Sequence, residues 1–337
     1  MTAPLKLNLW FDDELSRRAF LRVAAGLGVA AAAGPALGPT AARAQRVTRL
    51  TLGYMKIGDL SPMFIGLDKG FFRGEGLELN LTSMVGGAAI GPALASGALN
   101  VGWTNTVSMA ISHVKGLDFK FICNGALNKK GTNDVFGVQV LRDSPIRTAK
   151  DLEGKTIATN TLNNVITVAT RTWMDKNGGD SSTLKWLEIP FPQMEPALRN
   201  RQIDAFTAVE PFVTVPSSRT SRVIGHPLGE MAPSLLIASY FSTEEWINRN
   251  VDLVKRFNAA IAKGTEYHNA NKEEAREIIA KHTGQPKEIV QKVALPAFEV
   301  PIRDSDVQVF IDHSFKYRLI ERRFAAAEII SKLAPRA

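Results

Sequence analysis

The sequence contains a single cysteine, Cys123, among 337 residues. One cysteine excludes an intrachain disulfide and leaves no cysteine set for a zinc site. Cys123 ends the alternating run 119–123, which is typical of a strand, so we expect a buried structural thiol. The five histidines are scattered and show no His-x-x-x-His spacing. We therefore expect neither a metal site nor a cofactor.

Long runs of one residue type are also missing. The net charge of +8 is spread along the chain without a Lys/Arg cluster, so we expect no nucleic-acid partner. The apolar stretch 23–37 holds about 15 residues, and a membrane span needs ~18 or more. The sequence has no P-loop and no recognisable Ser, His and Asp set, so we expect a protein that is not an enzyme.

The N-terminus carries the parts of an export signal in their usual order. Arg17 and Arg18 lie in Ser-Arg-Arg-Ala-Phe-Leu, a twin-arginine motif, and the apolar stretch 23–37 follows. Ala-Arg-Ala at 42–44 is a small-x-small cleavage site. We expect a twin-arginine signal peptide at 1–44, cleaved near Ala44, and a periplasmic mature protein. The alternatives are a retained anchor, or a basic patch before a buried Ala-rich helix.

Strand and helix patterns alternate through the first two-thirds of the mature chain. The expected strands are 50–54, 77–81, 99–103, 155–158, 184–189 and 203–206. The expected helices begin at Ser61-Pro62, Gly86-Gly87, 104–106, Val165, Gln193 and Glu210-Pro211. After Ser242 the pattern is helical, with Asn271 and Glu274 placed as a capping box. Two α/β units in series predict two sheets covered by helices.

Several stretches resemble, in the same order, motifs of ABC-transporter substrate-binding proteins of the aliphatic sulfonate, taurine and nitrate group. The group is related to the thiamine-pyrimidine precursor proteins. Residues 53–60 resemble its first strand and loop, and 69–79 resemble K-G-F-F-x-x-E-G-L-x-V. Residues 95–102 resemble A-L-x-S-G-x-x-D-V-G, with Asn100 in place of Asp. Further matches are 151–158 to D-L-K-G-K-x-V-A, and 203–206 with 210–211 to I-D-A-x…E-P.

The resemblance, which covers about residues 47–285, implies a type II periplasmic-binding-protein fold. Two α/β lobes would be joined by two crossover segments with a ligand cleft between them. Lobe I would comprise 45–137 and 240–337, lobe II 142–234, and the hinge crossovers 138–141 and 235–239.

The implied function is the extracytoplasmic solute-binding component of an ABC importer, which captures a small ligand by lobe closure. Its partners would be the ligand, an ABC permease in the cytoplasmic membrane and, during export, the twin-arginine translocase. Two alternatives stay open. One is a pyrimidine-precursor-type binding protein or enzyme, and the other is a ligand-sensing receptor for a signalling partner.

The candidate ligand-binding residues lie mainly in polar or glycine-rich turns that lead from a strand into a helix. Ligands of open α/β sheets bind beyond the carboxyl ends of the strands, and helix N-termini there favour anions. We therefore expect an anionic ligand of the sulfonate, nitrate or aromatic-acid type. The candidates are Lys56, Ser61, Gly86, Gly87, Ala88, Thr104, Asn105, Thr106, Asn160, Thr161, Asn163, Asn164 and Glu210.

Each candidate also has an ordinary structural explanation. Helix capping alone accounts for any single turn. Lys56 either supplies charge to a ligand or is simply solvated. Glu210 either faces a ligand donor or complements a helix dipole. Trp103 and Phe136 form either an apolar wall of the cleft or part of the core.

Overall fold

The computed structural model describes residues 47–130 and 134–337. These belong to one compact unit, Gln45–Ala337. The expected signal peptide lies outside the described residues. No helix in the described part is long and apolar enough to span a membrane.

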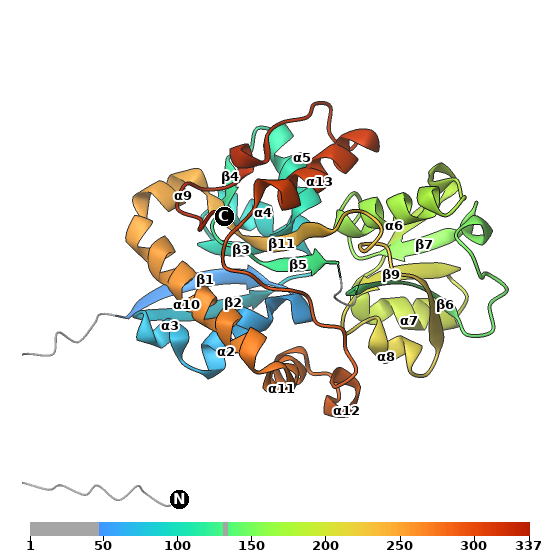
Figure 1. The fold of residues 1–337 in the computed structure, drawn as a ribbon, viewed down its shortest axis with the longest axis horizontal. Helices are drawn as coiled ribbons and strands as arrows, with labels where there is room; N and C mark the ends of the chain where they lie inside the picture. Colours follow the sequence, from blue (N-terminus) through green and yellow to red (C-terminus); the bar gives the residue numbers. More distant parts are fainter. Residues whose placement is uncertain (1–46, 131–133) are drawn as a thin grey trace, which may run out of the picture. The chain divides into compact units, whose positions relative to one another are not determined.

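Lobe I is built on a six-stranded sheet of order β2-β1-β3-β11-β4, with β5 paired to β11 (Figure 1). β1 runs parallel to β2 and β3, whereas β11 is antiparallel to β3. The turns that follow β1, β2 and β3 therefore meet at one edge of the sheet. The strands are β1 (Thr48–Tyr54), β2 (Leu77–Ser83), β3 (Val101–Asn105), β4 (Phe119–Phe121), β5 (Ala126–Lys129) and β11 (Ser234–Thr243).

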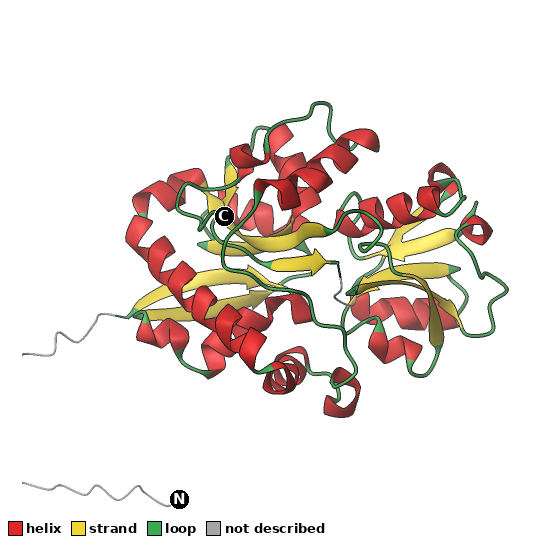
Figure 2. Ribbon diagram, viewed as in Figure 1, coloured by secondary structure: helices red, strands yellow, loops and turns green. Residues whose placement is uncertain are grey.

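Helices cover both faces of this sheet (Figure 2). One face carries α2 (Ser61–Asp68), α3 (Phe71–Gly74), α10 (Val251–Ala270) and α11 (Lys272–Thr283). The other carries α4 (Gly87–Ala95), α5 (Thr106–Val114) and α13 (Asp304–Lys316). The remaining short helices of this lobe are η1 (Gly58–Leu60), α9 (Glu244–Arg249), α12 (Lys287–Val290) and η4 (Ala326–Ile329).

Each face of the lobe I sheet has its own buried core. Leu52 of β1 packs with Phe64 of α2 and Phe257 of α10. On the opposite face, Ile90 of α4 and Ile311 of α13 belong to a separate cluster. The expectation that the C-terminal helices pack on lobe I is confirmed by the contacts of α10 and α11 with α2.

Lobe II is built on a five-stranded sheet of order β10-β6-β9-β7-β8 within the described residues. β7 is parallel to β8 and β9, and β6 is antiparallel to β9 and β10. The strands are β6 (Phe136–Leu141), β7 (Thr156–Thr159), β8 (Lys185–Glu188), β9 (Ala205–Val209) and β10 (Ser221–Gly225). The helices are α6 (Val165–Lys176), α7 (Phe191–Arg199), α8 (Thr214–Ser217), η2 (Lys150–Leu152) and η3 (Ser181–Thr183).

Local signals place some helix ends well and others poorly. α6 begins at Val165 as expected, because Asn164 caps its first turn, and Gly178, at φ 80°, follows its last turn. The capping box expected for α11 is wrong. Asn271 makes no side-chain cap bond there, and Glu274 instead bonds Lys69 and Tyr267.

The two α/β lobes expected from the sequence are confirmed, but the chain crosses between them at other residues. Residues 138–141 lie inside β6 and 235–239 inside β11. The crossings run between Lys129 and Phe136 and between Gly225 and Ser234. The physical reason is that a sheet strand and an extended crossover segment show the same alternating sequence pattern, so the pattern does not tell them apart. Similarly, Glu210-Pro211 does not open a helix, since α8 begins at Thr214.

Candidate ligand-binding site

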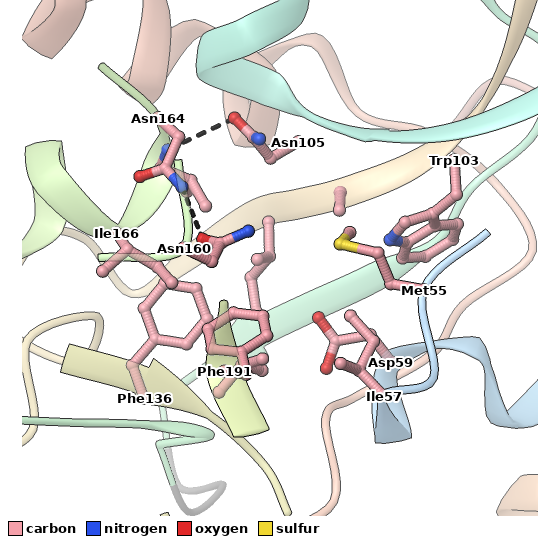
Figure 3. Close-up of a pocket in the computed structure, with 14 residues that line it drawn as sticks. Met55, Ile57, Asp59, Trp103, Asn105, Phe136, Asn160, Asn164, Ile166 and Phe191 are labelled. Atoms are coloured by element: carbon pink, nitrogen blue, oxygen red, sulfur yellow. Dashed lines mark hydrogen bonds between the residues drawn. The ribbon is translucent and has the colours of Figure 1, made fainter. Parts of the chain in front are cut away.

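A small cavity lies where strand ends of the two lobes face each other (Figure 3). Its volume is about 30 Å³, roughly the share of one water molecule in the liquid. Lobe I lines it with Met55, Ile57, Asp59, Trp103, Asn105, Ile237 and Ala238. Lobe II lines it with Phe136, Asn160, Asn164, Val165, Ile166, Phe191 and Val209. We call this space the interlobe cavity.

Aromatic rings form much of the cavity wall. Trp103 comes from β3, Phe136 from the first residue of β6 and Phe191 from the first residue of α7. Trp103 and Phe136 are also almost fully buried, at 0% and 1% exposure. The two roles considered for these residues therefore coincide, because each belongs to the core and lines the cavity.

Asn105 connects the two lobes. It caps α5, where its Oδ1 accepts a hydrogen bond from Ser108 N at 2.9 Å. The same oxygen accepts a second bond from Val165 N of lobe II at 3.2 Å. Its Nδ2 donates to Ser108 Oγ at 2.9 Å. Both polar atoms of this side chain are therefore already engaged.

Two asparagines of lobe II form a second network. Asn164 caps α6 by accepting from Thr167 N at 3.1 Å. Its Nδ2 donates to Asn160 Oδ1 at 2.8 Å and to Thr161 Oγ1 at 3.0 Å. Asn160 Nδ2 in turn donates to the carbonyl of Val85 in lobe I at 3.4 Å. These amides hold the loop before α6 in place and engage one another.

Asp59 and Trp103 differ from the asparagines because each leaves a buried polar atom unpaired. Asp59 lies in η1, directly after β1, and is 2% exposed. Its Oδ1 and the Nε1 of Trp103 have no hydrogen-bond partner. Burial, assisted by the negative charge of Glu210, raises the pKa of Asp59 to about 7. Unsatisfied buried polar atoms are rare in folded proteins, and each calls for an explanation.

Glu210 is buried beside this site but does not line the cavity. Its Oε1 accepts from Thr214 Oγ1 at 2.7 Å and from Ala294 N at 3.3 Å, and its Oε2 accepts from Thr214 N at 3.0 Å. Its backbone carbonyl accepts from Gly58 N of lobe I at 3.2 Å. Burial raises the pKa of Glu210. This residue therefore ties lobe II to lobe I and to the C-terminal part of the chain.

Three other candidates also lie outside the cavity. Lys56 is exposed and lines a neighbouring groove with Pro190 and Phe212. Ser61 is buried and its Oγ bonds Nδ1 of His268 at 2.8 Å. Thr106 Oγ1 donates to the carbonyl of Leu236 at 2.5 Å.

Three further candidates lie along a second groove. Gly87, Thr104 and Asn163 line this space of about 380 Å³ together with Lys115. Ala88 is in α4, next to Gly87. A side chain added at Gly86 would come within 2.8 Å of Thr161 Cγ2, so the backbone of lobe I closely approaches a side chain of lobe II here.

Of the candidate residues, the interlobe cavity thus brings together Asn105, Asn160 and Asn164. The sequence analysis missed Asp59 as a site residue, although Ser61, two residues further on, was among the candidates. It also missed the apolar lining from Met55, Ile57 and Phe191, because such residues carry no signal that separates a cavity wall from a core.

Charged and metal-ligating groups are sparse around the cavity. Its described lining contains no Lys, Arg or His. Within 47–130 and 134–337, no group of three or more His, Cys, Asp or Glu residues is placed to hold a metal ion.

Comparison with known proteins gives one family and many similar folds. A family model described as "NMT1/THI5 like" matches residues 58–275. No curated protein matches the sequence. The alkanesulfonate-binding protein of Xanthomonas axonopodis pv. citri has a similar structure, with 17% identity and a TM-score of 0.71 over 86% of this chain and 98% of that one.

Two further solved structures show the same fold. The periplasmic nitrate-binding protein of Synechocystis PCC 6803 has 15% identity and a TM-score of 0.72, with 86% of each chain covered. The periplasmic aliphatic sulphonate-binding protein of Escherichia coli has 16% identity and a TM-score of 0.68, with 84% of this chain and 92% of that one covered. At these identities the likeness concerns the fold.

Proposed function

Because the chain belongs to the NMT1/THI5-like family, we propose that it is the extracytoplasmic solute-binding component of an ABC importer. It captures a small ligand between its lobes and delivers it to a membrane permease. The fold it shares with periplasmic sulfonate-binding and nitrate-binding proteins supports this role.

The observation that carries the proposal is a small cavity to which both lobes contribute. The lobes meet there through Asn105 to Val165, Asn160 to Val85 and Gly58 to Glu210. At about 30 Å³ the cavity is far smaller than the ~300–1,000 Å³ of typical ligand pockets. A ligand larger than water therefore fits only when the lobes move apart, as in the hinge motions by which two-lobed proteins open and close.

The cavity favours binding over catalysis. Its described lining holds no serine, cysteine, histidine or lysine, and Asp59 is its one side chain able to act as a nucleophile or base. Ser61 and His268 do form a hydrogen-bonded pair, but neither lines the cavity. Burial lowers the pKa of His268 to about 3, and Phe298 packs against its ring. This pair fits a structural contact between α2 and α10.

A binding screen tests the proposal. The purified mature protein is heated with sulfonates, nitrate, carboxylates, amides and pyrimidines. A ligand at 100 times its Kd adds about 2.7 kcal/mol to the free energy of unfolding, which is a clear rise in Tm. If no compound in a broad panel shifts Tm, solute capture is the wrong function.

Uptake separates transport from sensing. Deleting the gene should abolish uptake of the ligand found in the screen. Normal uptake combined with a lost transcriptional response to the same ligand would identify a sensor instead.

We also propose that Arg17 and Arg18 direct export by the twin-arginine route, with cleavage near Ala44. Lysine at both positions should leave the precursor in the cytoplasm, as cell fractionation would show. Undiminished export of that variant would indicate the general secretory route.

A further inference from the structure

The interlobe cavity offers an unequal set of polar groups. The amide atoms of Asn105, Asn160 and Asn164 already make hydrogen bonds within the protein. Asp59 Oδ1 and Trp103 Nε1 make none. Figure 3 shows both side chains beside Met55, at the lobe I end of the cavity. Asp59 Oδ1 and Trp103 Nε1 are therefore the buried side-chain acceptor and donor of the described lining that have no partner at all.

The charges around the cavity oppose an anion. Asp59 lines it and Glu210 lies close enough to act on Asp59 electrostatically. No lysine, arginine or histidine of the described residues lines it. An anionic ligand would add a further negative charge to a site where low dielectric strengthens every repulsion.

The helix N-termini do not change this balance. At α5, Asn105 accepts from Ser108 N, and at α6, Asn164 accepts from Thr167 N and Asn105 accepts from Val165 N. The N–H groups that led us to expect an anion are thus partly occupied by the protein itself.

We propose that the interlobe cavity binds a small ligand through an amide-type group, which donates an N–H hydrogen bond to Asp59 Oδ1 and accepts one from Trp103 Nε1. Amides, ureas and lactams carry this donor and acceptor side by side. Beside ionised Asp59, a carboxylate would satisfy Trp103 alone and an amidinium would satisfy Asp59 alone. This inference rests on the proposed function, since it names the ligand class of the same cavity.

The remaining walls fit an apolar substituent on the amide. Phe136, Ile166 and Phe191 face the cavity from lobe II. They would cover the part of the ligand directed away from Asp59 when the lobes close. Lobe I therefore hydrogen-bonds the amide group, and lobe II covers the apolar substituent of the ligand.

The test uses two matched series on the mature protein, acetamide, acetamidine and acetate, then benzamide, benzamidine and benzoate. Binding is measured by isothermal titration calorimetry and by the shift in Tm. We expect the amide of a series to bind ~10-fold or more tightly than its two analogues, since each analogue leaves one buried partner unpaired.

The variant Asp59→Asn sharpens the test, because its side chain supplies an N–H donor where the carboxylate had none. Carboxylate binding should rise relative to amide binding, which shifts the preference by ~10-fold or more. Asp306→Asn is the matched control. Asp306 is 4% exposed and also has an unpartnered oxygen, but it lies in α13 outside the cavity. Its preference should equal that of the wild type.

The pH dependence gives an independent arm. Ionised Asp59 is a stronger hydrogen-bond acceptor than protonated Asp59. Because the pKa of Asp59 is about 7, the affinity for an amide should rise between pH 6 and pH 8. The other groups that act nearby are the Glu210 carboxyl at the start of the β9–α8 turn, and His268 of α10, which bonds Ser61. His268 stays neutral over this range. Asp59→Asn should remove most of the rise.

The outcomes separate the two proposals. Tighter binding of a carboxylate, sulfonate or nitrate by the wild type overturns the amide assignment and leaves solute capture intact. An unchanged preference in Asp59→Asn also overturns it. If neither series nor a broad panel binds, both proposals are wrong.

Discussion

The two sides of the interlobe cavity are equally apolar in character but differ in how their polar groups are used. On the lobe II side, Asn160 and Asn164 bond one another and the start of α6. On the lobe I side, Asp59 and Trp103 keep a buried acceptor and a buried donor unpaired. The two lobe II asparagines thus have partners, one of which is the Val85 carbonyl of lobe I, while lobe I carries the cost of two unsatisfied groups.

This difference assigns separate tasks to the lobes. Most hydrogen bonds of these asparagines lie within lobe II and keep their geometry with or without a ligand, so lobe II supplies a fixed surface. Unpaired groups gain most from a new partner, so lobe I supplies the discrimination. Asn105 is the exception, because this lobe I residue caps α5 and also bonds Val165 of lobe II.

The largest effect is expected from Asp59→Asn, which removes the buried, unpaired carboxyl of lobe I and changes the free energy of unfolding. The pKa of Asp59 rises from 3.8 to about 7 in the folded protein. Between these values the folded state keeps a proton that the unfolded chain has released, so stability falls as pH rises. The loss approaches about 4 kcal/mol above pH 7. Asp59→Asn should therefore be more stable than the wild type at pH 8 and nearly equal to it at pH 4.

Urea unfolding at a series of pH values measures this difference. The gap between the two proteins should open between pH 4 and pH 7. If the free energy of unfolding depends on pH in the same way for the wild type and for Asp59→Asn, burial does not raise the pKa of the Asp59 carboxyl.

The next effect breaks the contact between the lobes. Gly86→Val places a side chain against Thr161 across the interface, while φ at Gly86, 179°, suits any residue. The variant should fold but fail to close, with affinity lower by ~100-fold, about 2.7 kcal/mol. Small-angle scattering with ligand checks closure. Gly74→Ala, with nothing within 4 Å of the added Cβ, should bind normally.

A smaller effect separates the two roles of Asn105. Serine is as good an N-cap as asparagine, but its shorter side chain does not extend to Val165 of lobe II. Asn105→Ser should keep the stability of α5 within a few tenths of a kcal/mol and weaken ligand binding by about 5–10-fold, the worth of one hydrogen bond. Equal losses in Tm and in affinity would mean that the residue acts on lobe I alone.

The smallest effect concerns Lys56. Its exposed side chain lines the neighbouring groove rather than the interlobe cavity. Lys56→Ala should change affinity by less than about 2-fold, as expected of a solvated charge. A large loss that high salt abolishes in the wild type would instead show that Lys56 contacts or steers an anionic ligand.

The sequence predicted the framework of lobe II better than the chemistry of lobe I. Asn164 and Gly178 set both ends of α6, because capping and left-handed glycine are local effects. The same reasoning found the cavity asparagines, since a residue that caps a helix at the carboxyl edge of the sheet lies near any ligand bound there.

Asp59 could not be identified in this way, because its role depends on residues distant in the sequence. Nothing local shows that β1 delivers its carboxyl to a cavity with Trp103 or that Glu210 lies close to it. Ile237 and Ala238 were missed as cavity residues for the same reason, since their segment was interpreted as a crossover rather than as the sheet strand β11. All three residues line the cavity because of their tertiary placement, which sequence periodicity does not encode.

The single cysteine offers a way to measure local opening of the lobe I sheet. Cys123 is 3% exposed, burial raises the pKa of its thiol, and Ser239 Oγ donates to its backbone carbonyl. A thiol reagent reaches this sulfur only when the segment after β4 separates from β11. The rate of labelling therefore counts local opening events of the lobe I sheet. A ligand that merely closes the lobes would leave this rate unchanged, whereas one that stiffens lobe I would slow it.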